Sequence, residues 1–167
     1  PAVGHPNRFN QGMLEGKYAD IQHPSSENLY CEKIDVGDEV REIASGLQKY
    51  VPIDQMAGPV LVFTNLKARK LADFMSNGMV VANSDKDRTE IKLVVPKGKV
   101  GERIALDGFK EKFTQDKLPQ LNPKKKILEK CIDKFTTDAE GFALWNGHKL
   151  VTSEGFIQCP IPNGLLS

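Results

Sequence analysis

The residues with the clearest capacity for chemistry lie in one short stretch, NLKARKLADFMSNGM at residues 65–79. Lys67, Arg69 and Lys70 place three positive charges within four consecutive positions of it. Clustered cations of this kind bind phosphates and release counterions, so the affinity falls as salt is added. The stretch therefore predicts a binding site for a polyanion.

Three uncharged residues of the same stretch suggest which polyanion it is. Asn65 and Ser76 can donate hydrogen bonds to a phosphate, a ribose hydroxyl or a base edge. Met79 is flexible and polarisable enough to lie against a base. Each also has a structural explanation, because Asn65 can cap the loop, Ser76 can form a turn and Met79 can belong to the core. Their occurrence together beside three cations favours nucleic acid.

The distribution of charge along the chain makes the middle third basic. The formal net charge is only +1 over 167 residues. Residues 1–60 carry 5 basic and 9 acidic side chains, residues 61–134 carry 17 and 10, and residues 135–167 carry 1 and 3. A basic segment between two acidic flanks is typical of a surface that faces a polyanion, although lysine-rich faces are also common on proteins that bind none.

The sequence lacks the motifs of common enzyme classes. GxGxxG, GxxxxGK[ST], HExxH and GxSxG are all absent, so we expect no catalytic residue and no cofactor. Cys31, Cys131 and Cys159 form no CxxC pair and the histidines stand apart, which predicts neither a metal site nor a disulfide framework. No apolar run approaches the roughly 20 residues of a membrane span, and no signal-peptide pattern opens the chain. We therefore expect a cytoplasmic domain that contacts no membrane.

Short apolar segments predict a small β barrel. In residues 30–36 (YCEKIDV), Tyr30, Ile34 and Val36 fall on one face and polar residues on the other, as in a half-buried strand. The continuous apolar runs PVLVFT and GMVVA indicate strands buried on both faces. Gly and Pro between closely spaced strands are typical of barrels. The further strands are expected at residues 40–45, 59–64, 78–82 and 90–95, with a weaker one at 101–106.

From about residue 110 the pattern changes to a mixed α+β extension. Residues 124–135 (KKKILEKCIDKF) place apolar side chains along one helix face, after the capping pair Asn122-Pro123. Strand-like pieces on either side of Asn146-Gly147 predict a hairpin. We divide the chain into a leader or linker at 1–15, a barrel at 16–107 and an extension at 108–167.

Four segments, in order, resemble the tRNA-binding domain family. The NLK, basic pair and SxGM within residues 65–79 look like the family signature, and HPSSENLYCEKIDVG at residues 23–37 resembles its HPxAxxLYVExIDVG. The SGL of residues 45–47 and LNPKKKILEK at 121–130 complete the match, the last in members that carry an extra C-terminal domain. The family includes endothelial monocyte-activating polypeptide II, free bacterial tRNA-binding proteins and C-terminal domains of several methionyl- and tyrosyl-tRNA synthetases.

The resemblance implies a five-stranded OB-fold barrel that binds the outer corner of tRNA by shape and backbone. It also implies a monomer, in which the helix around Cys131 packs against the barrel and the extension takes the place of the second subunit of the bacterial dimers. An aromatic content of 7% fits recognition without a long stacking platform. The RNA-binding residues that carry over are Asn65, Lys67, Arg69, Lys70, Ser76 and Met79, with Ser45 as a secondary candidate.

Two departures from the family pattern affect these expectations. After the basic pair, members usually have Arg-Gly, whereas this chain has Ala72-Asp73. The loss of one phosphate contact lowers the salt slope by roughly 0.7–0.9, so we expect binding that is weaker or shifted towards other lysines. The other lysines are Lys97, Lys99 and, as secondary candidates, Lys124, Lys125 and Lys126.

In the family, an Arg-rich segment is tied to cytokine activity. The corresponding residues of this chain, 13–22, have the sequence MLEGKYADIQ, which disfavours that role here.

The expected function is a non-catalytic tRNA-binding appendage that assists an aminoacyl-tRNA synthetase in the same chain or in a complex. The alternative is a cytokine-like or adaptor protein whose basic face binds a protein partner or a sulfated glycan. This fragment is not expected to be an enzyme. Because it opens with Pro1, we expect a piece of something longer, and a methionyl-tRNA ligase is the first parent to consider, before tyrosyl and lysyl types.

Overall fold

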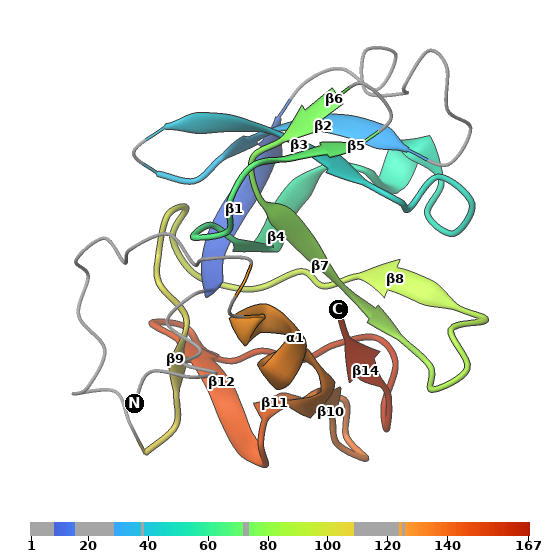
Figure 1. Cartoon of the computed structure of the whole chain (residues 1–167). Helices are drawn as coiled ribbons and strands as arrows, with labels where there is room; N and C mark the ends of the chain where they lie inside the picture. The colour runs from blue at the N-terminus through green and yellow to red at the C-terminus, as the bar shows by residue number, and fades with distance from the viewer. Residues whose placement is uncertain (1–8, 16–28, 38, 72–73, 109–123, 125) are drawn as a thin grey trace.

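The computed structural model describes residues 9–15, 29–37, 39–71, 74–108, 124 and 126–167 (Figure 1). They form a curled antiparallel sheet that makes a half-barrel, drawn in the upper part of Figure 1, and a group of short strands with one helix below it. The mainly β class and the OB-like curl predicted from the sequence are confirmed.

Five strands make the half-barrel, in the spatial order β3-β2-β1-β4-β7. Neighbours are antiparallel, with Cα partners such as Ile34↔Arg41 and Leu61↔Val81. At the free edge of β3, the amide of Asn77 donates to the carbonyl of Glu42 at 2.9 Å, so the chain that enters β7 covers this edge. The strands are β1 (Phe9–Glu15), β2 (Tyr30–Asp35), β3 (Val40–Ser45), β4 (Gly58–Phe63) and β7 (Met79–Ser84).

The sheet continues from the half-barrel into the C-terminal part of the chain. Strand β14 (Leu165–Leu166) pairs with β7 and with β10 (Phe135–Thr137), which begins the series β10-β11-β12-β13. Strand β9 (Ala105–Leu106) pairs with β12, on the extension side of the sheet. The remaining elements are η3 (Ile53–Gln55), β5 (Arg69–Leu71), β6 (Phe74–Ser76), β8 (Ile91–Leu93), α1 (Ile127–Cys131), η6 (Ile132–Lys134), β11 (Ala143–Trp145), β12 (His148–Thr152) and β13 (Gly155–Phe156).

The prediction of a leader at residues 1–15 is wrong for residues 9–15, which form strand β1. Strand β1 lies between β2 and β4, with Phe9 opposite Phe63 and Met13 opposite Asp35. The polar sequence FNQGMLE has no strict alternation of apolar residues, so local pattern did not reveal a strand that is fixed by backbone pairing to two neighbours.

The helix expected at residues 124–135 is shorter than predicted. Lys126 adopts the left-handed conformation at φ 49°, from which a regular helix cannot extend backwards, so α1 begins at Ile127. The helix tightens into η6, and Phe135 belongs to β10, where it pairs with Trp145. The apolar face itself was predicted correctly, because Leu128 and Ile132 pack on the core. The expected cap, Asn122-Pro123, lies outside the described residues.

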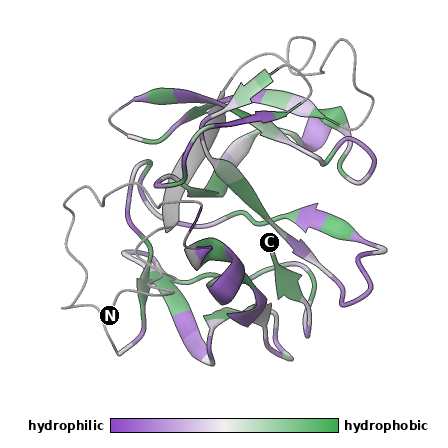
Figure 2. Cartoon of the chain, in the orientation of Figure 1, coloured by the Kyte–Doolittle hydropathy of each residue, from purple (hydrophilic) through white to green (hydrophobic). Residues whose placement is uncertain are grey.

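Two hydrophobic cores lie on opposite faces of β4 and β7. On β4, Val60 and Val62 belong to the core of the half-barrel, whereas Leu61 and Phe63 belong to a core shared with the extension. The continuous apolar run PVLVFT is explained by this double burial, and Figure 2 shows β7 hydrophobic over most of its length. The extension therefore packs against the half-barrel through apolar side chains from both parts.

Candidate nucleic-acid interface

The three cations of the predicted site remain together in the structure. Strands β5 and β6 form an antiparallel hairpin in which Arg69 is opposite Ser76 and Lys70 is opposite Met75. With Lys67, we call this unit the basic hairpin. Lys67, Arg69 and Lys70 are all exposed, and Figure 2 shows β5 as mostly hydrophilic. The sequence predicted a loop at these residues, whereas β5 and β6 pair as strands.

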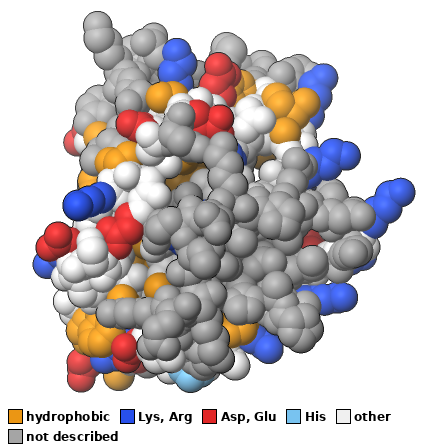
Figure 3. Space-filling model, turned by 90° about the vertical axis from the view of Figure 1, so that its left-hand side faces the viewer, with side chains coloured by type: hydrophobic (Ala, Val, Ile, Leu, Met, Phe, Trp, Pro, Cys, Tyr) orange, Lys and Arg blue, Asp and Glu red, His pale blue; other side chains and the backbone are white. Residues whose placement is uncertain are grey.

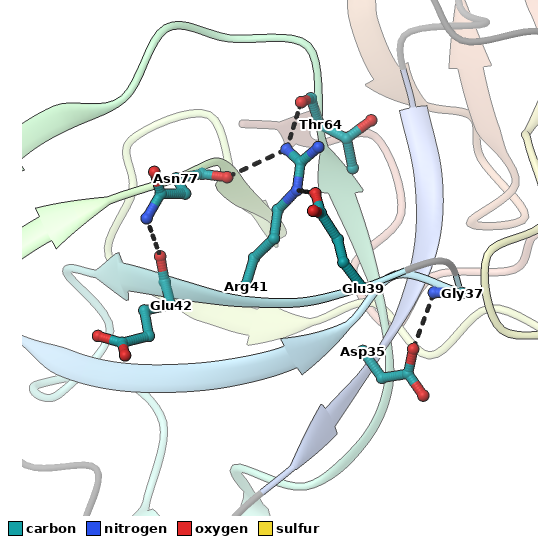
Figure 4. Close-up of polar contacts among 7 residues, drawn as sticks. All are labelled: Asp35, Gly37, Glu39, Arg41, Glu42, Thr64 and Asn77. Carbon is teal, nitrogen blue, oxygen red and sulfur yellow. Dashed lines mark hydrogen bonds and ion pairs between the residues drawn. The ribbon is translucent and has the colours of Figure 1, made fainter.

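Arg41 forms hydrogen bonds to both ends of residues 64–77, the segment that carries the basic hairpin. Arg41 lies on β3, and its Nη1 donates to the carbonyl of Thr64, at the end of β4, and to the carbonyl of Asn77, just before β7, the latter at 3.3 Å (Figure 4). Its Nε donates to Glu39 Oε1 at 2.6 Å. Asn77 Nδ2 adds a bond to the carbonyl of Glu42 at 3.3 Å. Sequence reasoning did not identify Arg41, whose partners lie 23 and 36 positions away.

Ser76 and Asn65 are buried rather than exposed beside the cations. The Ser76 hydroxyl accepts a bond from the amide of Ala44 at 2.9 Å and donates to the carbonyl of Gly78 at 3.0 Å. Its single proton is therefore used inside the fold, and this geometry favours the structural explanation for Ser76. Asn65 is 7% exposed, but it lines a groove of about 560 Å³ beside Arg41. Since Glu39 and Glu42 line the same groove, it is not a simple anion site.

Met79 and Ser45 are brought together around a second cavity. This cavity has a volume of about 370 Å³ and lies between the end of β3, the start of β7 and Leu71 of the basic hairpin. Met79 is partly buried, and Ser45 donates a hydrogen bond to the buried carboxylate of Glu32. The sequence predicted both residues as RNA contacts but gave no sign that they border one space.

The secondary candidates among the lysines lie apart from the basic hairpin. Lys124 and Lys126 are exposed just before α1, in the lower half of Figure 1, whereas β5 and β6 lie at the top. Lys125 lies outside the described residues. On the face drawn in Figure 3, the described Lys and Arg side chains project from the margins, several of them with acidic side chains close by. On that face the described basic side chains are therefore dispersed rather than gathered in one patch.

The buried ionisable groups give no sign of a reactive centre among the described residues. Burial raises the pKa of Cys159 to about 12, and the charge of Asp138 acts in the same direction, so this thiol stays protonated. No cluster of three or more His, Cys, Asp or Glu side chains suited to a metal occurs in the described ranges. Among those same residues, none of the helices has the length and apolar character that a membrane crossing requires.

Known sequences relate the chain to proteins of tRNA aminoacylation. The cytoplasmic methionine–tRNA ligase of Caenorhabditis elegans is 37% identical over 147 residues, which cover 86% of this chain and 16% of that protein. The aminoacyl tRNA synthase complex-interacting multifunctional protein 1 of Cricetulus griseus is 40% identical over 129 residues, which cover 75% of this chain and 34% of that protein. The chain thus spans about a third or less of these curated relatives.

A solved structure and a family model complete the assignment. The C-terminal domain of Plasmodium vivax p43 matches with a TM-score of 0.81 and 29% identity, over 100% of this chain and 99% of that one. Residues 19–103, half of the chain, match the model of a family described as a putative tRNA binding domain. The match includes the basic hairpin, Arg41 and the residues around the cavity between β3 and β7 as far as Ile91. The chain belongs to the putative tRNA binding domain family.

Proposed function

We propose that the chain is a non-catalytic tRNA-binding module that assists an aminoacyl-tRNA synthetase, in the same polypeptide or in a cytoplasmic complex. The observation that carries this proposal is the basic hairpin, whose three exposed cations stand on a segment fastened at both ends by Arg41. Fixed cations contact phosphates at a defined spacing, and so favour an RNA of a particular shape over an arbitrary polyanion.

The extension supports the module and is not proposed as the main RNA contact. Phe135 packs against Phe63 of the half-barrel with ring centroids 5.6 Å apart. We propose that residues 108–167 cover this face of the barrel, in the place of a second subunit, and that the free chain is a monomer. A basic surface that binds a sulfated glycan or a protein partner has no observation in its favour beyond its charge.

The proposal is tested by removing the charges of the basic hairpin. We expect the triple variant Lys67→Ala/Arg69→Ala/Lys70→Ala to lose at least about a hundredfold in affinity for mixed tRNA at low salt, with a salt slope lower by roughly 2–3. Fluorescence anisotropy with labelled tRNA over a series of salt concentrations measures both quantities. Sedimentation of the same samples gives the mass of the free chain.

The matched control removes three exposed lysines outside the basic hairpin and the other candidates, as Lys33→Ala/Lys92→Ala/Lys130→Ala, and should change the slope much less. Competition between heparin and tRNA then tests whether the chain prefers RNA to a sulfated glycan. If the triple variant binds tRNA with the wild-type slope, or if heparin and tRNA bind equally well, the proposed function is wrong.

Arg41 offers a test of the geometry at constant charge. We expect Arg41→Lys to weaken tRNA binding by roughly three- to tenfold, because a single ammonium group cannot contact Glu39 and the carbonyls of Thr64 and Asn77 with the geometry of Nε and Nη1. Anisotropy titrations compare it with Glu39→Ala, which removes the acceptor of Nε but leaves the two carbonyl contacts of Nη1 intact. Equal affinities for Arg41→Lys and the wild type would show that the hydrogen bonds of Arg41 do not position the basic hairpin.

A further inference from the structure

We propose that the cavity on β7 is a subsite for one unstacked nucleobase of the bound RNA. The inference rests on the proposed function and adds a ligand group to it. The cavity has a volume of about 370 Å³ and lies where β3 ends, beside the basic hairpin. We call it the β7 cavity. Its described lining includes Ser45, Gly46, Leu71, Met79, Ser84 and Arg88.

Along β7, the lining of the β7 cavity changes from apolar at Val80 to polar at Ser84. Val80, Ala82 and Ser84 alternate along β7, so their side chains fall on the same face of the strand. Met79 and Leu71 border the space on the side of the basic hairpin. A mostly apolar site of this size with a few polar groups is typical of a pocket for a small ring system.

The polar end contains a hydroxyl with unused capacity. Ser84 is 3% exposed, and its Oγ is buried with no hydrogen-bond partner among the described residues. A buried polar atom without a partner costs free energy, which a ligand with a donor or acceptor at its edge would recover. A base edge carries both kinds of group. Ser45, at the other wall, is a second hydroxyl that a base could contact.

The charges around the β7 cavity favour an anionic strand. Among the described residues that line it, Arg88 is the single ionisable side chain, and it is exposed. These described lining residues include no Asp or Glu side chain. Leu71 directly follows Lys70, so a base seated against Leu71 leaves its own phosphate near the cations of the basic hairpin. A positively charged groove that follows the RNA backbone is common to proteins that bind single strands.

Gly46 lines the β7 cavity and has room for a larger side chain. A Cβ built at Gly46 meets no atom within 4 Å, and this glycine has no left-handed backbone angle that would oppose a side chain. We expect Gly46→Leu to fold normally and to occupy part of the space that the base requires. Gly46→Ala is the matched control, because a single methyl group leaves most of the cavity open.

The first experiment compares two RNA probes: a single-stranded oligoribonucleotide with one 2-aminopurine, and a blunt RNA duplex with every base stacked. We expect Gly46→Leu to weaken binding of the single strand by about tenfold or more, as when a central contact of an interface is lost. Its salt slope should stay at the wild-type value, because no phosphate contact is removed. Binding of the duplex should be equal in all three proteins. The 2-aminopurine fluorescence should change on binding to the wild type and to Gly46→Ala, but not to Gly46→Leu.

The outcomes separate this inference from the proposed function. If Gly46→Leu binds the single strand like the wild type, or weakens the duplex equally, the nucleobase subsite is wrong. The triple variant of the basic hairpin still tests the proposed function, because that function predicts that this variant loses affinity and salt slope. If that variant keeps both, the proposed function fails, whatever Gly46→Leu does. A Ser84→Ala variant with a several-fold weaker single-strand affinity would further support the subsite, whereas wild-type affinity would contradict the role given to its hydroxyl.

Discussion

Glu32→Gln should remove most of the loss of stability that the wild-type chain shows between about pH 5 and pH 8. Glu32 lies on the buried face of β2 between Tyr30 and Ile34 and is 1% exposed. Its Oε1 accepts a bond from Ser45, but its Oε2 has no hydrogen-bond partner among the described residues. Burial is the main cause that raises the pKa of this carboxyl from 4.5 to about 8, and the Ser45 bond only partly opposes it.

The direction in which stability changes with pH follows from which state of the chain, folded or unfolded, keeps the Glu32 proton. Between pH 4.5 and about 8 the folded chain keeps the Glu32 proton and the unfolded chain releases it. The free energy of unfolding therefore falls as the pH rises through this window and levels off above it, with a total on the order of 3–5 kcal/mol. Glutamine has the same shape and does not titrate, so the variant should be the more stable protein at pH 8.

Urea denaturation of both proteins between about pH 5 and pH 9 measures this difference. Glu42→Gln is the matched control, because Glu42 is an exposed carboxylate on the neighbouring strand β3. It should leave the pH dependence of the wild type almost unchanged. Parallel curves for Glu32→Gln and the wild type would mean that Glu32 ionises in the folded chain as it does in water.

Phe135→Ala is expected to destabilise the half-barrel and the extension together, by about 3–5 kcal/mol. Phe135 is 2% exposed and lies in the core that joins Leu61, Phe63 and Val81 of the half-barrel to the extension. Its ring packs edge-on against Phe63, at an interplanar angle of 72°, and has a tilted contact with Trp145 at 6.4 Å between centroids. Truncation leaves a cavity that neither part can fill alone.

Equilibrium denaturation, followed by far-UV circular dichroism and Trp145 fluorescence, measures the loss. Phe156→Ala is the control, since this phenylalanine of the extension is 44% exposed and contacts Phe142 and Lys149 at the surface. We expect it to cost about 1 kcal/mol or less. Equal losses for the two variants would rule out a shared core centred on Phe135.

Local pattern was a good guide to the strands and a poor one to long-range contacts. Alternation correctly placed Tyr30, Ile34 and Val36 on the buried face of β2, and Asn146-Gly147 forms the predicted hairpin with both φ angles positive, at 50° and 83°. The same alternation puts Glu32 on the buried face of β2. Its burial was not predicted, because a charged side chain is ordinarily expected at the surface. Strand β1 was missed because its evidence is its pairing with β2 and β4.

The candidate site was predicted as a set of residues but not as an arrangement. The charges of Lys67, Arg69 and Lys70 could be recognised from spacing alone, and they are exposed together. Arg41 stands among Glu39 and Glu42 and reads as one more solvated charge until the fold brings Thr64 and Asn77 to it. Ala72-Asp73, the departure from the family signature, lies outside the described residues. Its effect on binding stays a prediction from the sequence.

The pairing of β7 with β14 has a consequence for the order in which the chain is made. Asn83 Nδ2 donates to the carbonyl of Leu165, which lies 82 positions later, and the amide of Ala82 donates to the carbonyl of Ser167. A ribosome that adds 5–20 residues per second needs roughly 4–16 s to cover that separation. For those seconds each newly made chain carries β7 with one edge unpaired, and neighbouring chains on the same messenger RNA can pair with it. Crowded polysomes, rather than the finished protein, are therefore where misassembly should begin.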